Sequence, residues 1–191
     1  VGIIKSMLPT DNSILLRADI DALPIEEEND KEYRSVNKGM MHACGHDGHA
    51  AMLMGAAKVL NDNRKLLKHN VFLVFQPAEE GPAPGGAKIL LDEMRKNGYL
   101  EHIKFAYGQH MWNNCDIGKV VLFQGNAMAS CDDFEIEIVG KGGHAAMQHL
   151  SVDAISVAAK FINNMESYMG RFTDPFTPEV FSVGTISGGT A

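Results

Sequence analysis

The segment 42–49 reads HACGHDGH and concentrates three imidazoles, a thiol and a carboxylate in one short stretch. Cys44 and His46 are two positions apart. In an extended segment or a tight turn, this spacing can bring a thiolate and an imidazole to the same side of the backbone. Both groups are ligands that suit Zn, Mn, Co or Ni. The segment therefore indicates a metal site.

Two further clusters follow apolar runs that are typical of buried strands. Glu79 and Glu80 come after the run 71–75, and His110 comes after the run 103–107. Taken singly, a histidine or a glutamate pair is more often a surface feature, and a free cysteine is more often a small buried apolar group. The joint order of thiol, imidazole, paired carboxylates and imidazole instead favours a metal-dependent hydrolase site at strand ends.

The chain resembles the M20 metallopeptidases in four motifs: RADIDALPI at 17–25, HACGHDGH at 42–49, FQPAEEG at 75–81 and GKGGHAA at 140–146. Within that family it is similar to the amidohydrolase branch, which includes hippurate hydrolases, N-acyl-amino-acid deacylases, diaminopimelate deacetylases and auxin-conjugate hydrolases. The resemblance implies hydrolysis of the amide bond of an N-acyl amino acid, or of a related small peptide-like conjugate. It also implies two divalent metal ions, which would be Zn, Mn, Co or Ni.

The resemblance also implies a role for each candidate residue. The expected metal ligands are Cys44, His46, Glu80 and His110. Glu79 is expected to be the general base and later the general acid. Asp19 stands where other M20 enzymes have a ligand histidine, so we expect Asp21 to orient a ligand imidazole rather than to bind metal itself. An alternative role for Asp21 is that of a turn cap before Pro24.

The first part of the chain alternates strand and helix patterns, which is typical of an α/β layer fold. Strands are predicted at 12–20, 70–75 and 103–107, and the last two read as buried runs. Helices are predicted at 48–60 and 85–95. By resemblance, this part is a zinc-peptidase-like catalytic domain with a mixed sheet and flanking helices.

The pattern changes in the last third of the chain, and we predict two domains, 1–128 and 129–191. Residues 134–139 alternate apolar and charged side chains, which predicts a half-exposed antiparallel strand. A helix is predicted at 153–165 and another strand at 179–186. This β-loop-α-β order matches the start of a smaller α+β domain, which in the resembled family is the lid or dimerisation domain.

His144 lies in a glycine-rich turn of that second domain. The resemblance implies that it binds substrate across a homodimer interface, whereas by its sequence context alone it would be a surface turn residue. Members of the resembled family are longer and carry one more metal-binding histidine, and residues 1–5 read as a strand already under way. We therefore expect a fragment. The alternative reading is a truncated, non-catalytic remnant that folds and dimerises without activity.

Composition narrows the possible partners of this 191-residue chain. Its net charge of -7 and pI near 5.6 disfavour nucleic acid, because an acidic surface repels phosphate. Because no apolar run approaches the ~20 residues of a membrane span, we expect no membrane partner. We see no signal-peptide pattern, and the three irregularly spaced cysteines favour free thiols and a cytoplasmic location. A purely structural zinc site is disfavoured, since it would have no use for Glu79 and Glu80.

Overall fold

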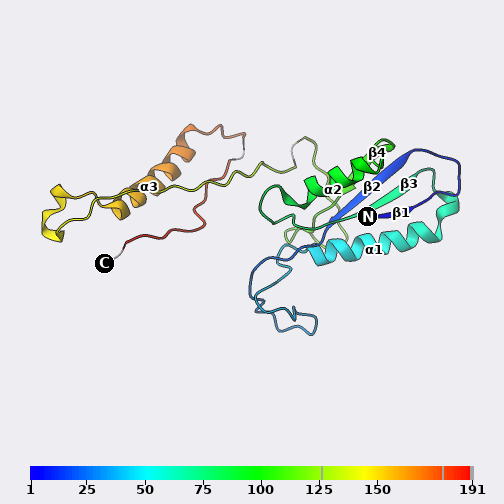
Figure 1. Ribbon diagram of the computed structural model, residues 1–191, viewed down its shortest axis with the longest axis horizontal. Helices are drawn as coiled ribbons and strands as arrows, with labels where there is room; N and C mark the ends of the chain where they lie inside the picture. Colours follow the sequence, from blue (N-terminus) through cyan, green and yellow to red (C-terminus); the bar gives the residue numbers. More distant parts are fainter. Residues whose placement is uncertain (126, 178, 190–191) are drawn as a thin grey trace. The chain divides into compact units, whose positions relative to one another are not determined.

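In the computed structural model, a four-stranded sheet with the order β1–β3–β2–β4 organises the first part of the chain (Figure 1). The strands are β1 (Gly2–Ile4), β2 (Ser13–Asp19), β3 (Asn70–Gln76) and β4 (Ile103–Gly108). β2 runs parallel to both β3 and β4, whereas β1 pairs antiparallel with β3. The predicted α/β architecture with a mixed sheet is confirmed.

Two helices cover the two faces of this sheet. α1 (His46–Asp62) and α2 (Gly85–Lys96) include the two predicted helices, and a short 3₁₀ turn, η1 (Arg64–Leu66), follows α1. The cluster on the α1 side consists of Ile4, Ala18, Leu53, Val71 and Leu73. The cluster on the α2 side consists of Leu15, Phe72, Val74 and Met94. Successive residues of β3 enter opposite clusters, which explains why its sequence is a continuous apolar run.

The prediction of a second buried strand at 103–107 was wrong in one respect. β4 forms where expected, but Phe105 and Tyr107 are exposed. The reason is its position, because β4 is an edge strand of the sheet in the described part of the chain, and of its residues Ile103 is the one that packs against a core cluster. An apolar run predicts a strand but does not specify its place in the sheet.

The three parallel strands end at the same edge of the sheet. In the register, Asp19 at the end of β2 pairs with Gln76 at the end of β3, and Arg17 pairs with Gly108 at the end of β4. In open α/β sheets this carboxyl edge is the usual place for a ligand site. The segments that carry Asp21, the two glutamates and His110 all start from it.

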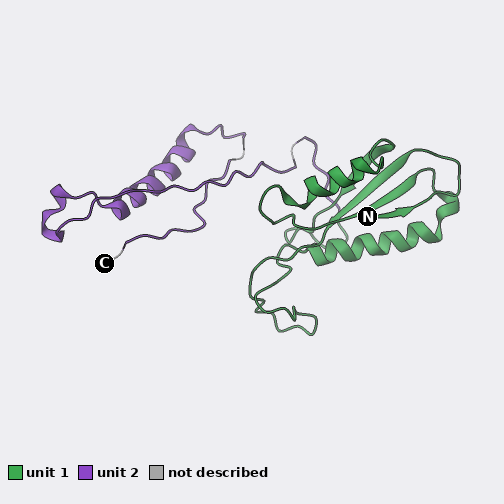
Figure 2. Cartoon of the chain, in the orientation of Figure 1, with its two compact units in different colours: residues 1–119 green, residues 120–191 purple. Residues whose placement is uncertain are grey.

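The structure describes residues 1–125, 127–177 and 179–189, which form two compact units, 1–119 and 120–191 (Figure 2). None of the helices in these residues is long and apolar enough to cross a membrane. Residues within each unit contact one another more than they contact the other unit, and this division says nothing about function. The functional division at 128/129 into a catalytic and a lid domain stays a prediction.

The second unit contains η2 (Ala145–Leu150) and α3 (Ala154–Phe172), and α3 extends the helix predicted at 153–165. The strands predicted at 134–139 and 179–186 do not appear as such in the described residues of this unit. The ring of Phe134 nevertheless stacks on that of Phe181, with centroids 5.8 Å apart. An alternating pattern reports which side chains share a face, whereas a strand also needs a hydrogen-bonded neighbour.

Candidate metal centre

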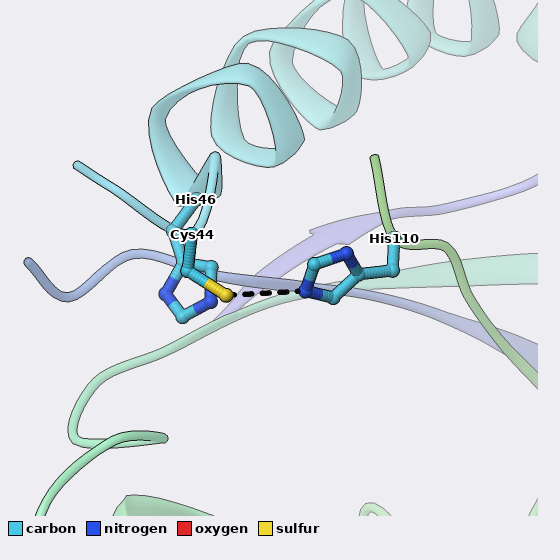
Figure 3. Close-up of side chains that lie close together, drawn as sticks. All are labelled: Cys44, His46 and His110. Atoms are coloured by element: carbon cyan, nitrogen blue, oxygen red, sulfur yellow. Dashed lines mark hydrogen bonds between the residues drawn. The ribbon is translucent and has the colours of Figure 1, made fainter. Parts of the chain in front are cut away.

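Cys44 and His110 face each other although they are far apart in the sequence (Figure 3). Cys44 precedes α1 and His110 follows β4, and the distance from Cys44 Sγ to His110 Nε2 is 3.4 Å. His110 Nδ1 lies 2.6 Å from the carbonyl oxygen of Met111. Because a carbonyl oxygen only accepts, Nδ1 carries a proton, and in the neutral ring Nε2 presents its lone pair to Cys44.

His46 is the first residue of α1 and is almost completely buried. It follows Gly45, whose φ of 85° lies in the left-handed region that glycine adopts without strain. His46 Nδ1 donates to Asp21, with the carbonyl oxygen at 3.0 Å and Oδ1 at 3.1 Å. In the neutral ring the lone pair is therefore on Nε2, which is buried without a hydrogen-bond partner among the described residues. Such a nitrogen is what a histidine metal ligand offers.

Glu79 and Glu80 complete the cluster from the segment after β3. Glu80 Oε1 lies 4.0 Å from His46 Nε2, beyond hydrogen-bond distance. Two overlapping donor sets have all their donor atoms within 4.8 Å of one another, and they share His46. The first set consists of Cys44, His46 and His110, and the second of His46, Glu79 and Glu80.

The electrostatics of the cluster favour a cation. Burial, a hydrogen bond with Glu80 and the negative charges of Glu79, Glu80 and Asp19 raise the pKa of the Cys44 thiol to about 11. These groups repel a thiolate in the absence of a positive charge. A divalent cation among them would offset that repulsion and deprotonate the thiol. The residues present therefore fit a metal ion.

Asp21 connects two parts of the cluster. Its Oδ2 accepts a hydrogen bond from the Glu80 N–H at 2.9 Å, while its Oδ1 faces His46. Burial works against its charged form, but hydrogen bonds from the N–H groups of Glu80 and of Asp21 itself, and from His46, hold its pKa below the ordinary value. Asp21 is thus an anionic hydrogen-bond acceptor for both His46 and the Glu80 N–H. Its role beside a metal-binding imidazole stays a prediction.

A third donor group, Asp19, His46 and His49, is fully buried. Arg17 Nη1 lies 2.7 Å from Asp19 Oδ2, and His49 Nδ1 is hydrogen-bonded to Asp19 Oδ1. Burial works to raise the pKa of Asp19, but the His49 hydrogen bond and the Arg17 charge outweigh it and lower the pKa. Because Asp19 and His49 are engaged with protein groups, this group is a hydrogen-bonded support. Arg17 was not predicted as a site residue, although residues i and i+2 of a strand share a face and Arg17 stands two before Asp19.

His144 belongs to the second unit. It caps η2, and its Nδ1 accepts a hydrogen bond from the Ala146 N–H at 3.1 Å. Its proton in the neutral form is therefore on Nε2. The side chain is exposed, so that N–H is free to donate to a ligand.

The chain matches peptidase family M20/M25/M40 over residues 15–178. It is 44% identical over 178 residues to an N-acyl-L-amino acid amidohydrolase of Geobacillus stearothermophilus, covering 93% of this chain and 47% of that protein. Thus the chain spans about half the length of that relative.

Two solved structures are similar to the chain. A protein of methicillin-resistant Staphylococcus aureus assigned as an aminohydrolase has a TM-score of 0.69 and 32% identity, covering 99% of this chain and 49% of that one. The YXEP protein of Bacillus subtilis, a dinuclear metal binding peptidase, has a TM-score of 0.51 and 41% identity, covering 59% and 30%. With these likenesses and the match over most of its length, the chain belongs to peptidase family M20/M25/M40, and its relatives include amidohydrolases of that family.

Proposed function

We propose that this chain carries the metal-binding half of a hydrolase that cleaves the amide bond of N-acyl amino acids. The observation that carries the proposal is the buried Nε2 of His46, which has no hydrogen-bond partner in the described part of the chain and faces a thiol and carboxylates. The similarity to an N-acyl-L-amino acid amidohydrolase supports the substrate class. The similarity to a dinuclear metal binding peptidase supports two divalent ions.

The proposed ligands are Cys44, His46, Glu80 and His110. Two ligand atoms of a tetrahedral zinc ion lie about 3.5 Å apart, as follows from ligand distances of about 2.0–2.3 Å. The Cys44–His110 separation of 3.4 Å matches this spacing. When bound, divalent ions in such a site polarise the amide carbonyl and lower the pKa of a water molecule.

Glu79 is the proposed proton carrier. The Glu80 N–H is held by Asp21, and the carboxylates of Glu79 and Glu80 both lie within 4.8 Å of the His46 ring, so one can bind a cation while its neighbour faces the attacked water. Glu79 takes a proton from the water molecule as the water oxygen bonds to the amide carbon. It then delivers that proton to the amide nitrogen as the C–N bond breaks. The products are the carboxylate of the acyl group and the free amino acid.

We further propose that His144 binds the carboxylate of the substrate through its Nε2–H, and that the second unit forms the homodimer contact. The hydrogen bond from the Ala146 N–H to Nδ1 supports this role, because it leaves Nε2–H as the remaining donor of an exposed side chain. We also propose a cytoplasmic location, where the free thiols of Cys44, Cys115 and Cys131 would persist.

The test is hydrolysis of a panel of N-acetyl and N-benzoyl amino acids by the full-length protein that contains this chain, treated with a chelator and then supplied with Zn, Mn, Co or Ni. We expect release of free amino acid only after metal is returned. Cys44→Ser should weaken metal binding and turnover, whereas Cys115→Ser, at a thiol outside the donor sets, should change neither. Full turnover by the metal-free protein, or none with any of the four ions, would refute the proposal.

A further inference from the structure

His49 is buried at the first turn of α1, and both of its ring nitrogens are engaged by the protein. We propose that His49 is a positioning residue that holds His110 opposite Cys44 by accepting a hydrogen bond from the Met111 N–H. This inference rests on the proposed function, since it concerns how the metal centre is held together. It assigns no ligand role to His49.

The partners of His49 determine which nitrogen carries its proton. The Met111 N–H points at Nε2 from 2.9 Å, and a backbone N–H can only donate. Nε2 must therefore carry a lone pair, and the proton of the neutral ring is on Nδ1. Nδ1–H donates to Asp19, which makes both hydrogen bonds favourable at once.

Other contacts between the segment around His110 and α1 lie near this bond. Gln109 Nε2 donates to Met52 Sδ at 3.1 Å. The Met111 side chain packs over Gly48, where an added Cβ would lie 2.3 Å from its sulfur atom. The rings of His49 and His110 lie 4.6 Å apart at their centroids. His49 thus contacts both the backbone after His110 and the His110 ring.

Asp19 and Arg17 hold His49 in turn. Asp19 is buried at the end of β2, and Arg17 donates both to Asp19 at 2.7 Å and to Gln76 Oε1 at 2.9 Å. A continuous path therefore runs from the ends of β2 and β3 through His49 to the segment after β4. Its consequence is that His110 is fixed relative to the sheet before any metal binds.

Two substitutions separate the two bonds of His49. In His49→Gln the side-chain oxygen takes the approximate position of Nε2, so the acceptor for Met111 is kept. In His49→Asn the amide nitrogen takes the approximate position of Nδ1, so only the bond to Asp19 is kept. The measurement is a titration of the metal-free protein with Co²⁺. Binding is monitored by the charge-transfer absorption from the Cys44 thiolate to cobalt, and circular dichroism is the folding control.

We expect His49→Asn to weaken Co²⁺ binding by about 10–100-fold, the usual effect of removing a group that holds a metal ligand. His49→Gln should remain within a few-fold of the wild type. Equal affinity of the two variants, or a greater loss in His49→Gln, would overturn the inference. A wild-type protein that takes up no Co²⁺ would instead refute the metal centre itself, so the two failures are distinguishable.

A second measurement applies even if neither variant folds. The ¹⁵N spectrum of the metal-free wild-type protein reports the tautomer of each histidine. A proton on His49 Nδ1 and a bare Nε2 that accepts from the Met111 amide would support the inference. A proton on His49 Nε2 would overturn it, because that nitrogen could then not accept from Met111.

Discussion

The backbone N–H of Glu80 donates to Oδ2 of Asp21 at 2.9 Å, while the other oxygen of the same carboxylate faces His46 Nδ1 at 3.1 Å. One side chain thus holds two proposed ligands from separate segments. We predict that Asp21→Ala lowers metal affinity by about 10–100-fold. Asp21→Asn, which keeps one acceptor, should lose less. Competition with a chelator of known affinity measures both, and unchanged affinity in Asp21→Ala would contradict the prediction.

Substitutions of the adjacent residues Glu79 and Glu80 should differ in their effects on turnover and metal content. Glu79→Gln removes the proposed proton carrier, so we expect kcat to fall by roughly 10²–10⁴ while metal content stays near that of the wild type. Glu80→Gln removes a proposed ligand, so it should lose metal as well as turnover. Metal analysis beside kcat distinguishes them, and equal metal loss in both variants would show that the assigned roles are wrong.

His144 should affect activity without affecting metal content, because it belongs to the second unit. His144→Ala is expected to raise KM or lower kcat while the metal-to-protein ratio stays constant. Mixing His144→Ala chains with Glu79→Gln chains tests the proposed dimer. Recovered activity would show that His144 acts on the partner's site, and no recovery would contradict that role.

Gly86 lies where α2 meets the segment that leads to the glutamates. An added Cβ there would lie 1.8 Å from the Pro77 carbonyl oxygen, so the backbone would have to move. We predict that Gly86→Ala destabilises the protein by about 1–3 kcal/mol and weakens metal binding.

The matched control for Gly86 is Gly55→Ala. Gly55 lies on α1 with nothing within 4 Å of an added Cβ, so alanine there should stabilise by about 0.5–1 kcal/mol. Chemical denaturation measures both variants. Equal stability changes in the two variants would argue against the close approach at Pro77.

Asp153 should make the start of α3 sensitive to acid. Its side chain accepts from the Ser156 hydroxyl and from the N–H groups of Ser156 and Ile155, and these bonds hold its pKa below the ordinary 3.8. A carboxyl whose pKa is lower in the folded state stabilises that state above its unfolded pKa. This stabilisation is lost as the pH falls through the folded pKa.

The wild type is compared with Asp153→Asn, because asparagine caps a helix about as well as aspartate but does not titrate. Far-UV circular dichroism should show helicity lost below about pH 4 in the wild type in excess of that in Asp153→Asn, since asparagine also caps helices. Asp153→Ala should have lower helicity at neutral pH as well. Identical acid profiles for the wild type and Asp153→Asn would contradict the assignment.

The local sequence determined most of the first unit. The apolar run at 70–75 predicted β3, and the helical spacing at 48–60 and 85–95 predicted α1 and α2. These signals are local, because they depend on which side chains share a face. They could not place β4 at the sheet edge or supply hydrogen-bonded neighbours for residues 134–139.

The sequence also contained the donor types of the candidate site, since the order of a thiol, imidazoles and paired carboxylates is legible without a fold. The tertiary structure decided how each donor is oriented. The hydrogen bond from His46 Nδ1 to Asp21 leaves Nε2 of His46 available. The hydrogen bond from the Met111 N–H occupies Nε2 of His49, whose Nδ1 already contacts Asp19. His46 and His49 look equivalent in the sequence. They differ because parallel strands bring distant backbone groups to one edge, and those groups determine which nitrogen remains available.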